Sequence, residues 1–591
     1  MGVHQSPEER VSMHRGRDEE GRVVVGDGTS VGMDRRGFMA FFTTAGLGGT
    51  LLPGVLWASA QEAGTVTVEM LEQAERVAGL SFTPTEREMM VEGLDRNLRA
   101  YGELRRTPIP NAVAPAVLFD PMLPGRPYPE GRSELRMTRE RGIERPRRLE
   151  EVAFWPVTRI SELVRTRQVT SVELTEMYLG RLREYGPRLE AVITLTEDLA
   201  LSQARRADSE ISTGRYRGPL HGIPWGAKDL LAAPGYPTTW GARPYEEQHI
   251  DDHATVVRKL DEAGAVLVAK LTLGALAMGD YWFGGRTRNP WNLEQGSSGS
   301  SAGSAAATVA GLVGFAIGSE TLGSIVSPST RTGASGLRPT FGRVSRHGAM
   351  ALSWTMDKLG PICRSAEDCA LVLHAIHGAD GKDPTARTVP FSWDAHLPLE
   401  GIRVGYLAGA FAEEHGTKAF DDEALRVIRG LGVEPIPVEL PGEFPLGALR
   451  VILSAEAAAA FDDLTLSGRD DLLVRQTQGS WPNSFRTARM IPAVEYIQAN
   501  RIRTMVMGAL DTALEGVDVF VTPSFGGDVL LMTNLTGHPA AVVPSGFTDE
   551  GTPVSISFVG QLWGDAATLR VAKAYQDATD HHRRRPPLFD V

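Results

Sequence analysis

Residues 296–306 of this 591-residue chain read G-S-S-G-S-S-A-G-S-A-A, and residues 318–325 read G-S-E-T-L-G-S-I. A Gly/Ser run is typical of a flexible linker. This run, however, continues into an uncharged, alanine-rich stretch at 305–315 that leaves no room for a loose tether. A Gly/Ser loop that opens a buried helix presents backbone N–H groups and hydroxyls to a ligand. We therefore interpret these stretches as loops of a functional site.

The first stretch also resembles two other kinds of loop, but it lacks a feature that each of them requires. A phosphate-binding P-loop ends in Lys-Ser or Lys-Thr, which is missing here. Residues 299–303 match the G-x-S-x-G elbow, which would make Ser301 the nucleophile of an α/β-hydrolase. That elbow must follow a buried strand, whereas residues 289–295 (N-P-W-N-L-E-Q) read as a loop. Both interpretations are disfavoured.

A third segment, H-G-I-P-W-G-A-K-D at 221–229, contains one of only seven lysines among the 61 basic residues. Lys228 lies among Gly, Ala, Pro and Trp, so we expect its side chain to be at least partly buried. Burial disfavours the ammonium form and lowers the pKa, as a lysine acting as a base near neutral pH requires. The alternative, equally compatible with the residues, is a structural ion pair with Asp229 or another carboxylate.

Together the three segments resemble the amidase signature family, whose usual motifs run close to G-G-S-S-G-G-S-A-A and G-T-D-T-G-G-S-I. Further similar segments at 333–345, 360–368 and 534–539 extend the resemblance over roughly 149–591. The resemblance implies hydrolysis of a carboxamide through a serine acyl-enzyme, with a Ser–Ser–Lys triad whose first serine carries a cis peptide bond. The matched positions imply Lys228 as the base, Ser300 as the bridging serine and Ser324 as the nucleophile.

The resemblance also implies an oxyanion hole made by the backbone N–H groups of Thr321, Leu322, Gly323 and Ser324. Three residues of this segment depart from the family pattern. Leu322 replaces a glycine, and its side chain is expected to narrow the loop and change its backbone angles. Glu320 replaces an aspartate and Val326 replaces an arginine, so the ion pair between these two positions is expected to be lost or replaced. None of these changes removes a triad hydroxyl or amine.

Weaker signals concern substrate binding, metals and thiols. Candidate substrate-binding residues are Met278, Tyr281 and Ser301, although the aromatic run at 281–283 is more typical of a core. His538 is expected to make a structural hydrogen bond. The thirteen histidines include no H-E-x-x-H pattern, so neither a metal nor another cofactor is expected. Cys363 and Cys369 are expected to be buried free thiols rather than a disulfide.

Short apolar, β-rich runs alternate with helical stretches from about residue 150 to the end of the chain. This alternation predicts the α/β class, with a large mixed sheet covered by helices on both faces. Residues 61–105 are predicted to be a small helical appendage with a capping box at Thr83 and Glu86. Residues 106–148 contain eight prolines and are predicted to be a linker. The catalytic domain is expected to span 149–591.

Residues 1–60 are predicted to be a leader with a twin-arginine-type export signal. Arg35 and Arg36 precede a mildly apolar run that ends in Ala58-Ser59-Ala60, a small-x-small cleavage pattern. Such a signal predicts a periplasmic or secreted protein. An uncleaved signal would instead anchor the protein, because 38–60 is just long enough to span a membrane. No stable membrane insertion is expected once the signal is removed.

The formal charge of −12 gives no electrostatic reason to expect nucleic acid as a partner. The expected partner is a small-molecule amide. The oligomeric state is left open, with a homodimer as one alternative. Two other functions remain. One is the glutaminase A subunit of a tRNA-dependent amidotransferase, which the export signal argues against. The other is a catalytically impaired binding homologue, suggested by Leu322 and Val326.

Overall fold

The computed structural model describes residues 66–590 apart from 105, 107, 108, 114 and 116, together with the short paired strands β1 (Gly16–Arg17) and β2 (Val23–Val24). The chain divides into two compact units, Met1–Ile109 and Pro110–Val591. The export signal predicted around Arg35 and Arg36 lies outside the described residues. Of the linker predicted over 106–148, residues 110–148 fall within the second unit and contain one short strand, β3 (Leu135–Arg136).

The described part of the first unit contains two helices, α3 (Val68–Ala78) and α4 (Pro84–Leu104). The predicted capping box at the start of α4 is confirmed. The Thr83 N–H donates to Glu86 Oε2 at 2.6 Å, and the Glu86 N–H donates to Thr83 Oγ1 at 3.3 Å. An ion pair of 2.9 Å between Glu75 and Arg87 joins the two helices.

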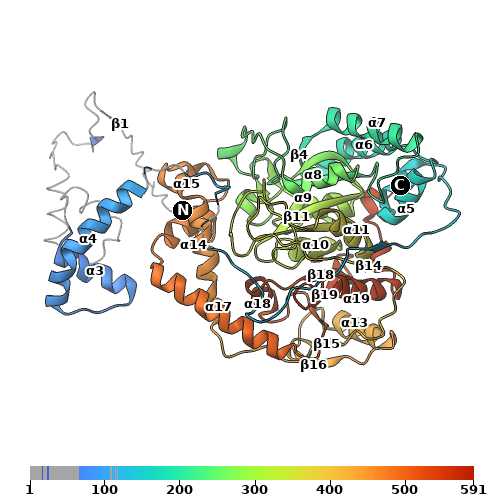
Figure 1. Ribbon diagram of the computed structural model, residues 1–591. Helices are drawn as coiled ribbons and strands as arrows, with labels where there is room; N and C mark the ends of the chain where they lie inside the picture. Colours follow the sequence, from blue (N-terminus) through green and yellow to red (C-terminus); the bar gives the residue numbers. More distant parts are fainter. Residues whose placement is uncertain are drawn as a thin grey trace, which may run out of the picture. The chain divides into compact units, whose positions relative to one another are not determined.

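An eleven-stranded mixed sheet forms the centre of the second unit (Figure 1). Its central pairs β5–β6 and β5–β11 are parallel, whereas β11–β13, β12–β13 and β18–β19 are antiparallel. From one edge to the other the strands are β16 (Ile436–Val438), β15 (Val404–Leu407), β17 (Val519–Pro523), β19 (Pro553–Gly560), β18 (Ala540–Phe547), β12 (Ser335–Arg338), β13 (Lys358–Cys363), β11 (Phe315–Glu320), β5 (Pro224–Lys228), β6 (Val266–Leu271) and β4 (Val192–Leu195).

Side chains of the strands alternate between two apolar layers, as the period of two in a strand requires. Phe315 and Ile317 of β11 belong to one hydrophobic cluster, and Ala316 between them belongs to another. Helices cover both faces of the sheet (Figure 1). One face packs against α8 (Thr255–Glu262), α11 (Ala366–Ile376), α13 (Lys418–Gly430) and α19 (Asp565–Asp577); the other packs against α6 (Ser171–Leu189), α7 (Glu197–Ser212), α9 (Ala302–Val309), α10 (Val326–Thr332), α17 (Ala493–Ala513) and α18 (Val529–Thr536).

The remaining helices surround these layers. They are α5 (Val157–Arg165), α12 (Ala408–Ala412), α14 (Arg450–Ala460), α15 (Asp462–Leu466) and α16 (Trp481–Ala488). Short ribbons pair β7 (Tyr281–Trp282) with β8 (Gly285–Arg286), β9 (Arg288–Asn289) with β10 (Asn292–Gly296), and β14 (Trp393–Asp394) with β3. The predicted fold class, a mixed α/β sheet covered on both faces, is confirmed.

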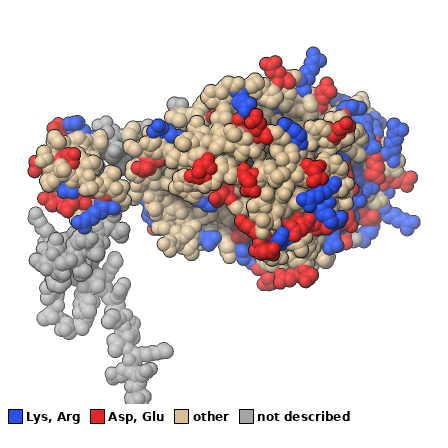
Figure 2. Space-filling view, turned by 90° about the horizontal axis from the view of Figure 1, so that it is seen from below, with Lys and Arg blue, Asp and Glu red and all other residues tan. Residues whose placement is uncertain are grey.

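Acidic and basic side chains are interspersed on the face of the second unit that Figure 2 shows. Many of them pair locally, for example Arg258 with Glu262 at 2.6 Å. Among the described helices, none has both the length and the apolar character needed to cross a membrane.

The pairing of β5 with β11 determines where a functional site can form. Because β5 and β11 are parallel neighbours, their carboxyl ends, Lys228 and Glu320, lie at the same edge of the sheet. In α/β sheets, ligands bind outside the carboxyl ends of parallel strands. The loops that follow these two strands therefore meet where a site is expected.

Candidate active site

Lys228 is the last residue of β5, and its side chain is fully buried. Its Nζ lies 2.8 Å from Ser300 Oγ, 2.9 Å from Ser319 Oγ and 3.1 Å from Ser301 Oγ. The amine is thus enclosed by three hydroxyl groups, two from the loop before α9 and one from β11. No carboxylate forms an ion pair with it among the described residues.

Burial sets the protonation state of this lysine. It lowers the pKa of Lys228 to about 7, while the charges of Asp357 and Glu320 act in the opposite direction. The alternative of an ion pair with Asp229 is wrong, because Asp229 pairs with the buried Lys270 at 2.7 Å. Lys228 is therefore available as a base near neutral pH.

Ser300 follows a cis peptide bond from Gly299, in the loop that leads into α9. Only glycine fits before it, because a Cβ on Gly299 would lie 1.9 Å from the carbonyl oxygen of Gly279. The next residue joins this loop to the second one, since the Ser301 N–H donates to the Ser324 carbonyl at 3.1 Å. A backbone hydrogen bond thus joins the residue after Ser300 to Ser324.

Ser324 lies in the turn between β11 and α10, and the residue is 8% exposed. Gly323 has a φ of 83°, a left-handed conformation that favours glycine. Leu322 is not among the described residues with positive φ. The left-handed conformation of the turn therefore falls on Gly323 and not on the leucine. Within the described chain, the N–H groups of Leu322, Gly323 and Ser324 donate to no protein group. They are free to bind an oxyanion.

Glu320, the last residue of β11, stabilises the 321–324 turn. Its carboxylate accepts the N–H groups of Ile325 at 2.8 Å and Val326 at 2.9 Å, and it pairs with Arg338 at 2.9 Å. Although burial alone would raise it, the Arg338 guanidinium and the Val326 N–H hold the pKa of Glu320 at about 2. The ion pair expected to be lost or replaced at Glu320 and Val326 is therefore replaced by Glu320–Arg338.

The side chain of Thr321 is held by the carboxylate of Asp357. Its hydroxyl donates to Asp357 at 2.6 Å, and the same carboxylate accepts the N–H groups of Leu352 and Ser353. The 352–357 loop is held in turn by Glu456 of α14, which accepts from the Ser353 hydroxyl at 2.6 Å. Helix α14 thus reaches the 321–324 turn through a continuous path of buried hydrogen bonds.

The sequence did not point to Ser319, Arg338 or Asp357 as parts of this site. Ser319 contacts Lys228 across 91 positions of the chain, and Arg338 reaches Glu320 across 18. No local pattern marks such contacts. The only signal was that Arg338 falls in the 333–345 segment and Asp357 just before the 360–368 segment, both of which resemble the family.

The three candidate substrate-binding residues lie in different surroundings. The Ser301 side chain is fully buried, donates to the Ser319 carbonyl at 3.1 Å and accepts from Lys228, so it supports the lysine and faces no open surface. Met278 is partly buried against the main core. Tyr281 is 37% exposed, between the guanidinium groups of Arg286 and Arg475.

Two cavities border the catalytic loops. One of about 80 Å³ is lined by Ser319, Thr321 and Asp357, and its wall also includes Leu230 and Ala277. The other, of about 470 Å³, includes Ser298 and Ser327 in its wall and lies between α10 and the 410–421 segment. Thr321 in the first cavity and Ser327 in the second each lie three residues from Ser324, so a substrate has space near this turn.

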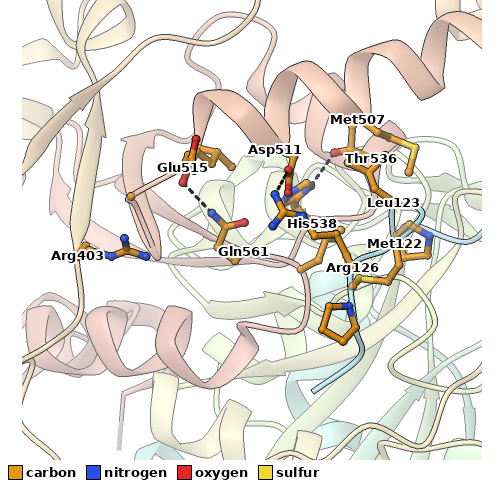
Figure 3. A pocket seen from close by; sticks show the side chains of 15 residues that line it. Met122, Leu123, Arg126, Arg403, Met507, Asp511, Glu515, Thr536, His538 and Gln561 are labelled. Atoms are coloured by element: carbon orange, nitrogen blue, oxygen red, sulfur yellow. Dashed lines mark hydrogen bonds and ion pairs between the residues drawn. The ribbon is translucent and has the colours of Figure 1, made fainter. Parts of the chain in front are cut away.

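His538 lies in a separate cavity of about 290 Å³, shown in Figure 3. It makes the structural hydrogen bond that was expected, between its Nδ1 and Thr536 Oγ1 at 2.8 Å. Burial, followed by the charge of Arg338, lowers the pKa of His538 to about 3. The imidazole is therefore neutral and is held by the fold.

Two further predictions concern thiols and metals. Cys363 and Cys369 are both buried and free, as expected. In the part of the chain that the structure describes, no group of three or more His, Cys, Asp or Glu side chains is arranged to hold a metal ion.

Comparisons with known proteins identify the family and the fold. The protein family described as Amidase matches residues 173–530. The A subunit of the glutamyl-tRNA(Gln) amidotransferase from Moorella thermoacetica is 33% identical over 484 residues, covering 74% of this chain and 99% of that protein. The crystal structure of native peptide amidase from Stenotrophomonas maltophilia superposes with a TM-score of 0.67 at 32% identity, covering 75% of this chain and 100% of that one. An amidase family protein from Bacillus anthracis gives a TM-score of 0.66 at 26% identity, with 74% and 93% covered.

The family match covers more than half of the chain, and the relatives are matched over nearly their whole length. The fold, the buried lysine and the two serine loops occupy the matched region. This chain belongs to the amidase signature family of amide-hydrolysing enzymes.

Proposed function

We propose that Ser324 attacks the carbonyl carbon of a carboxamide, with Ser300 and Lys228 relaying its proton. In this proposal the two N–H groups of the neutral lysine are donated to the Ser301 and Ser319 hydroxyls, 3.1 Å and 2.9 Å away. Ser301 accepts because its own proton is given to the Ser319 carbonyl. This leaves the lone pair of the lysine for the Ser300 proton, 2.8 Å away. Ser300 then accepts the proton of Ser324.

The attack forms a C–O bond and moves the carbonyl electron pair onto oxygen. The free N–H groups of the 321–324 turn stabilise that oxyanion. The relay then runs in reverse and protonates the leaving nitrogen as the C–N bond breaks. Water hydrolyses the acyl-Ser324 ester, using the same relay to take its proton.

The observation that carries this proposal is the fully buried Lys228 among three hydroxyls, with its pKa near 7. Replacement Ser324→Ala is expected to lower the kcat for amide hydrolysis by about 10⁴-fold or more, because no other nucleophile is activated. Ser212→Ala, on the exposed end of α7, is the matched control and should retain full activity. Comparable turnover in Ser324→Ala and Ser212→Ala would rule out the proposed nucleophile.

The amidotransferase subunits among the relatives support a second candidate, in which the enzyme works only within a larger assembly. Purified enzyme should hydrolyse simple amides alone if it is self-sufficient. Release of ammonia from glutamine that requires a second purified protein would instead support the assembly. The third candidate, an impaired binding homologue, predicts no turnover of any amide.

We also propose that the enzyme is exported through the twin-arginine-type signal predicted within 1–60. Paired arginines, the apolar run and the small-x-small end support this. An exported enzyme meets its amide as a free small molecule, which agrees with a self-sufficient amidase and requires neither cofactor nor nucleic acid.

A further inference from the structure

The cavity of about 470 Å³ beside the catalytic loops combines two kinds of wall. Ser298 and Ser327 form the wall toward the triad. Glu413 and His415, between α12 and α13, and Asp421, in the first turn of α13, line another part of the wall. We call this cavity the 413–421 pocket.

The pocket is continuous with the proposed nucleophile's loop. Ser298 lies two residues before Ser300, and Ser327 lies three residues after Ser324 in the first turn of α10. The Ser327 N–H donates to the Gly323 carbonyl at 2.7 Å, and the position of a Cβ on Gly323 would be 3.0 Å from Ser327 Oγ. Part of a substrate held for attack by Ser324 therefore has this pocket next to it.

Asp421 is the unusual group in the pocket. The residue is 2% exposed, and its Oδ2 accepts no hydrogen bond from the described residues. The nearest basic group is His415, whose Nε2 lies 3.4 Å away. Lys418 on the same helix bonds Asp422 instead, at 2.9 Å. A buried carboxylate oxygen without a hydrogen-bond donor is costly, and a donor from a ligand would remove that cost.

The other lining groups fit a ligand with an alkyl chain and a positive end. Glu413 is exposed at the rim and adds a second carboxylate on the same wall. Arg331, the lining guanidinium on α10, is directed to Gln295 at 3.4 Å. Pro523, Phe525 and Val554 supply apolar surface along the side. The volume lies within the usual range for small-molecule sites.

Burial also raises the pKa of Asp421 to about 6, with His415 acting in the opposite direction. The carboxylate is thus ionised in neutral or slightly alkaline solution, where an alkyl ammonium is still protonated. Measurements at about pH 8 place both groups in their charged forms.

We propose that the 413–421 pocket is a substrate subsite that binds a primary ammonium carried on an alkyl chain of the amide, with Asp421 as its main partner and Glu413 as a second. The inference rests on the proposed function, because it takes Ser324 as the point of attack. It extends that function by assigning the substrate class: amides that bear a basic group several bonds from the scissile carbonyl or nitrogen.

Two matched substrate pairs test the two possible orientations in the full-length enzyme. On the acyl side, 6-aminohexanoyl p-nitroanilide is compared with hexanoyl p-nitroanilide. On the leaving-group side, N-acetyl-1,5-diaminopentane is compared with N-pentylacetamide. At least one cationic member should show a kcat/KM about 10–100-fold above its neutral partner, as one charged hydrogen bond provides. Equal kcat/KM values within both pairs would overturn the inference.

Three variants assign the preference to the pocket. Asp421→Asn should abolish it and leave the neutral substrate within about threefold, whereas Asp422→Asn, an exposed neighbour, should keep it. Glu413→Gln, at an exposed position that cannot disturb folding, should reduce it several-fold even if Asp421→Asn fails to fold. A preference unchanged in both pocket variants contradicts the inference. Hydrolysis of the neutral amides with no preference overturns the subsite alone, whereas no hydrolysis of any pair overturns the proposed function and the subsite with it.

Discussion

At the scale of single residues, the protonation of Lys228 determines when the relay works. The lysine accepts a proton only when neutral, and burial brings its pKa to about 7. We therefore expect kcat/KM to rise as the pH increases through about 7, approaching a tenfold loss per pH unit below it. The pH profile of a neutral amide measures this. Activity that is flat from about pH 5.5 to 8.5, or that falls as the pH rises, would contradict a lysine base.

The enclosure of Lys228 also explains why it is not an ion-pair lysine. Lys270, on the neighbouring strand, lies 2.7 Å from the carboxylate of Asp229, whereas the amine of Lys228 contacts only hydroxyl and carbonyl oxygens among the residues that the structure describes. We expect Lys228→Met to lower kcat by about 10²–10⁴-fold with an intact fold. The exposed Lys382→Met provides the control, and circular dichroism with thermal unfolding checks the fold. A kcat in Lys228→Met close to that of Lys382→Met would exclude the lysine from the relay.

At the scale of elements, the Glu320–Arg338 pair joins β11, β12 and the start of α10. Both side chains are fully buried, and Glu320 also holds two N–H groups next to Ser324. Replacing one member of a buried pair leaves the other charge unpaired, at a cost of about 3–5 kcal/mol. Arg338→Met should lower the free energy of unfolding by that amount and reduce kcat as the turn loosens.

The matched control for that prediction is Arg403→Met. Arg403 pairs with Asp518 at 2.8 Å, but its side chain is 56% exposed, and exposed pairs contribute about 0–1 kcal/mol. Denaturant unfolding of both variants gives the comparison. A loss in Arg338→Met no larger than that in Arg403→Met would mean that the buried pair does not stabilise the turn.

The same elements show what the sequence could and could not reveal. Lys228 was recognisable because its Gly-Ala-Pro-Trp setting predicts burial, and the helix at Pro84 because its capping box is local. Ser319 and Asp357 were missed because their contacts with Lys228 and Thr321 run between strands and loops far apart in the chain. The 413–421 pocket was missed for the same reason, since its walls come from five separate segments.

At the scale of the whole molecule, the relatives account for only part of the chain. The match covers 74% of this chain and 99% of the amidotransferase relative, so about a quarter of the chain lies outside it. The appendage helices α3 and α4 lie before the family match at 173–530. The export signal proposed within 1–60 precedes them.

Export gives a prediction for the full-length protein. Changing Arg35 and Arg36 to lysine should keep the precursor in the cytoplasm, because the paired arginines are the recognised feature. Changing Arg15 and Arg17 to lysine preserves the paired arginines and should leave export intact. Cell fractionation followed by an amidase assay measures both. If both variants were found in the same cell fractions in equal proportion, the twin-arginine proposal would be wrong.

The central claim is that Ser324 becomes acylated by means of Lys228, and covalent labelling tests it most directly. The full-length enzyme is treated with a fluorophosphonate, and the modified residue is located by peptide mass spectrometry. We predict one phosphonyl group on Ser324, no labelling of Ser324→Ala, and slow labelling of Lys228→Met. Labelling of a different residue in the wild-type protein, or an unlabelled Ser324 in enzyme that still hydrolyses amides, would contradict the account.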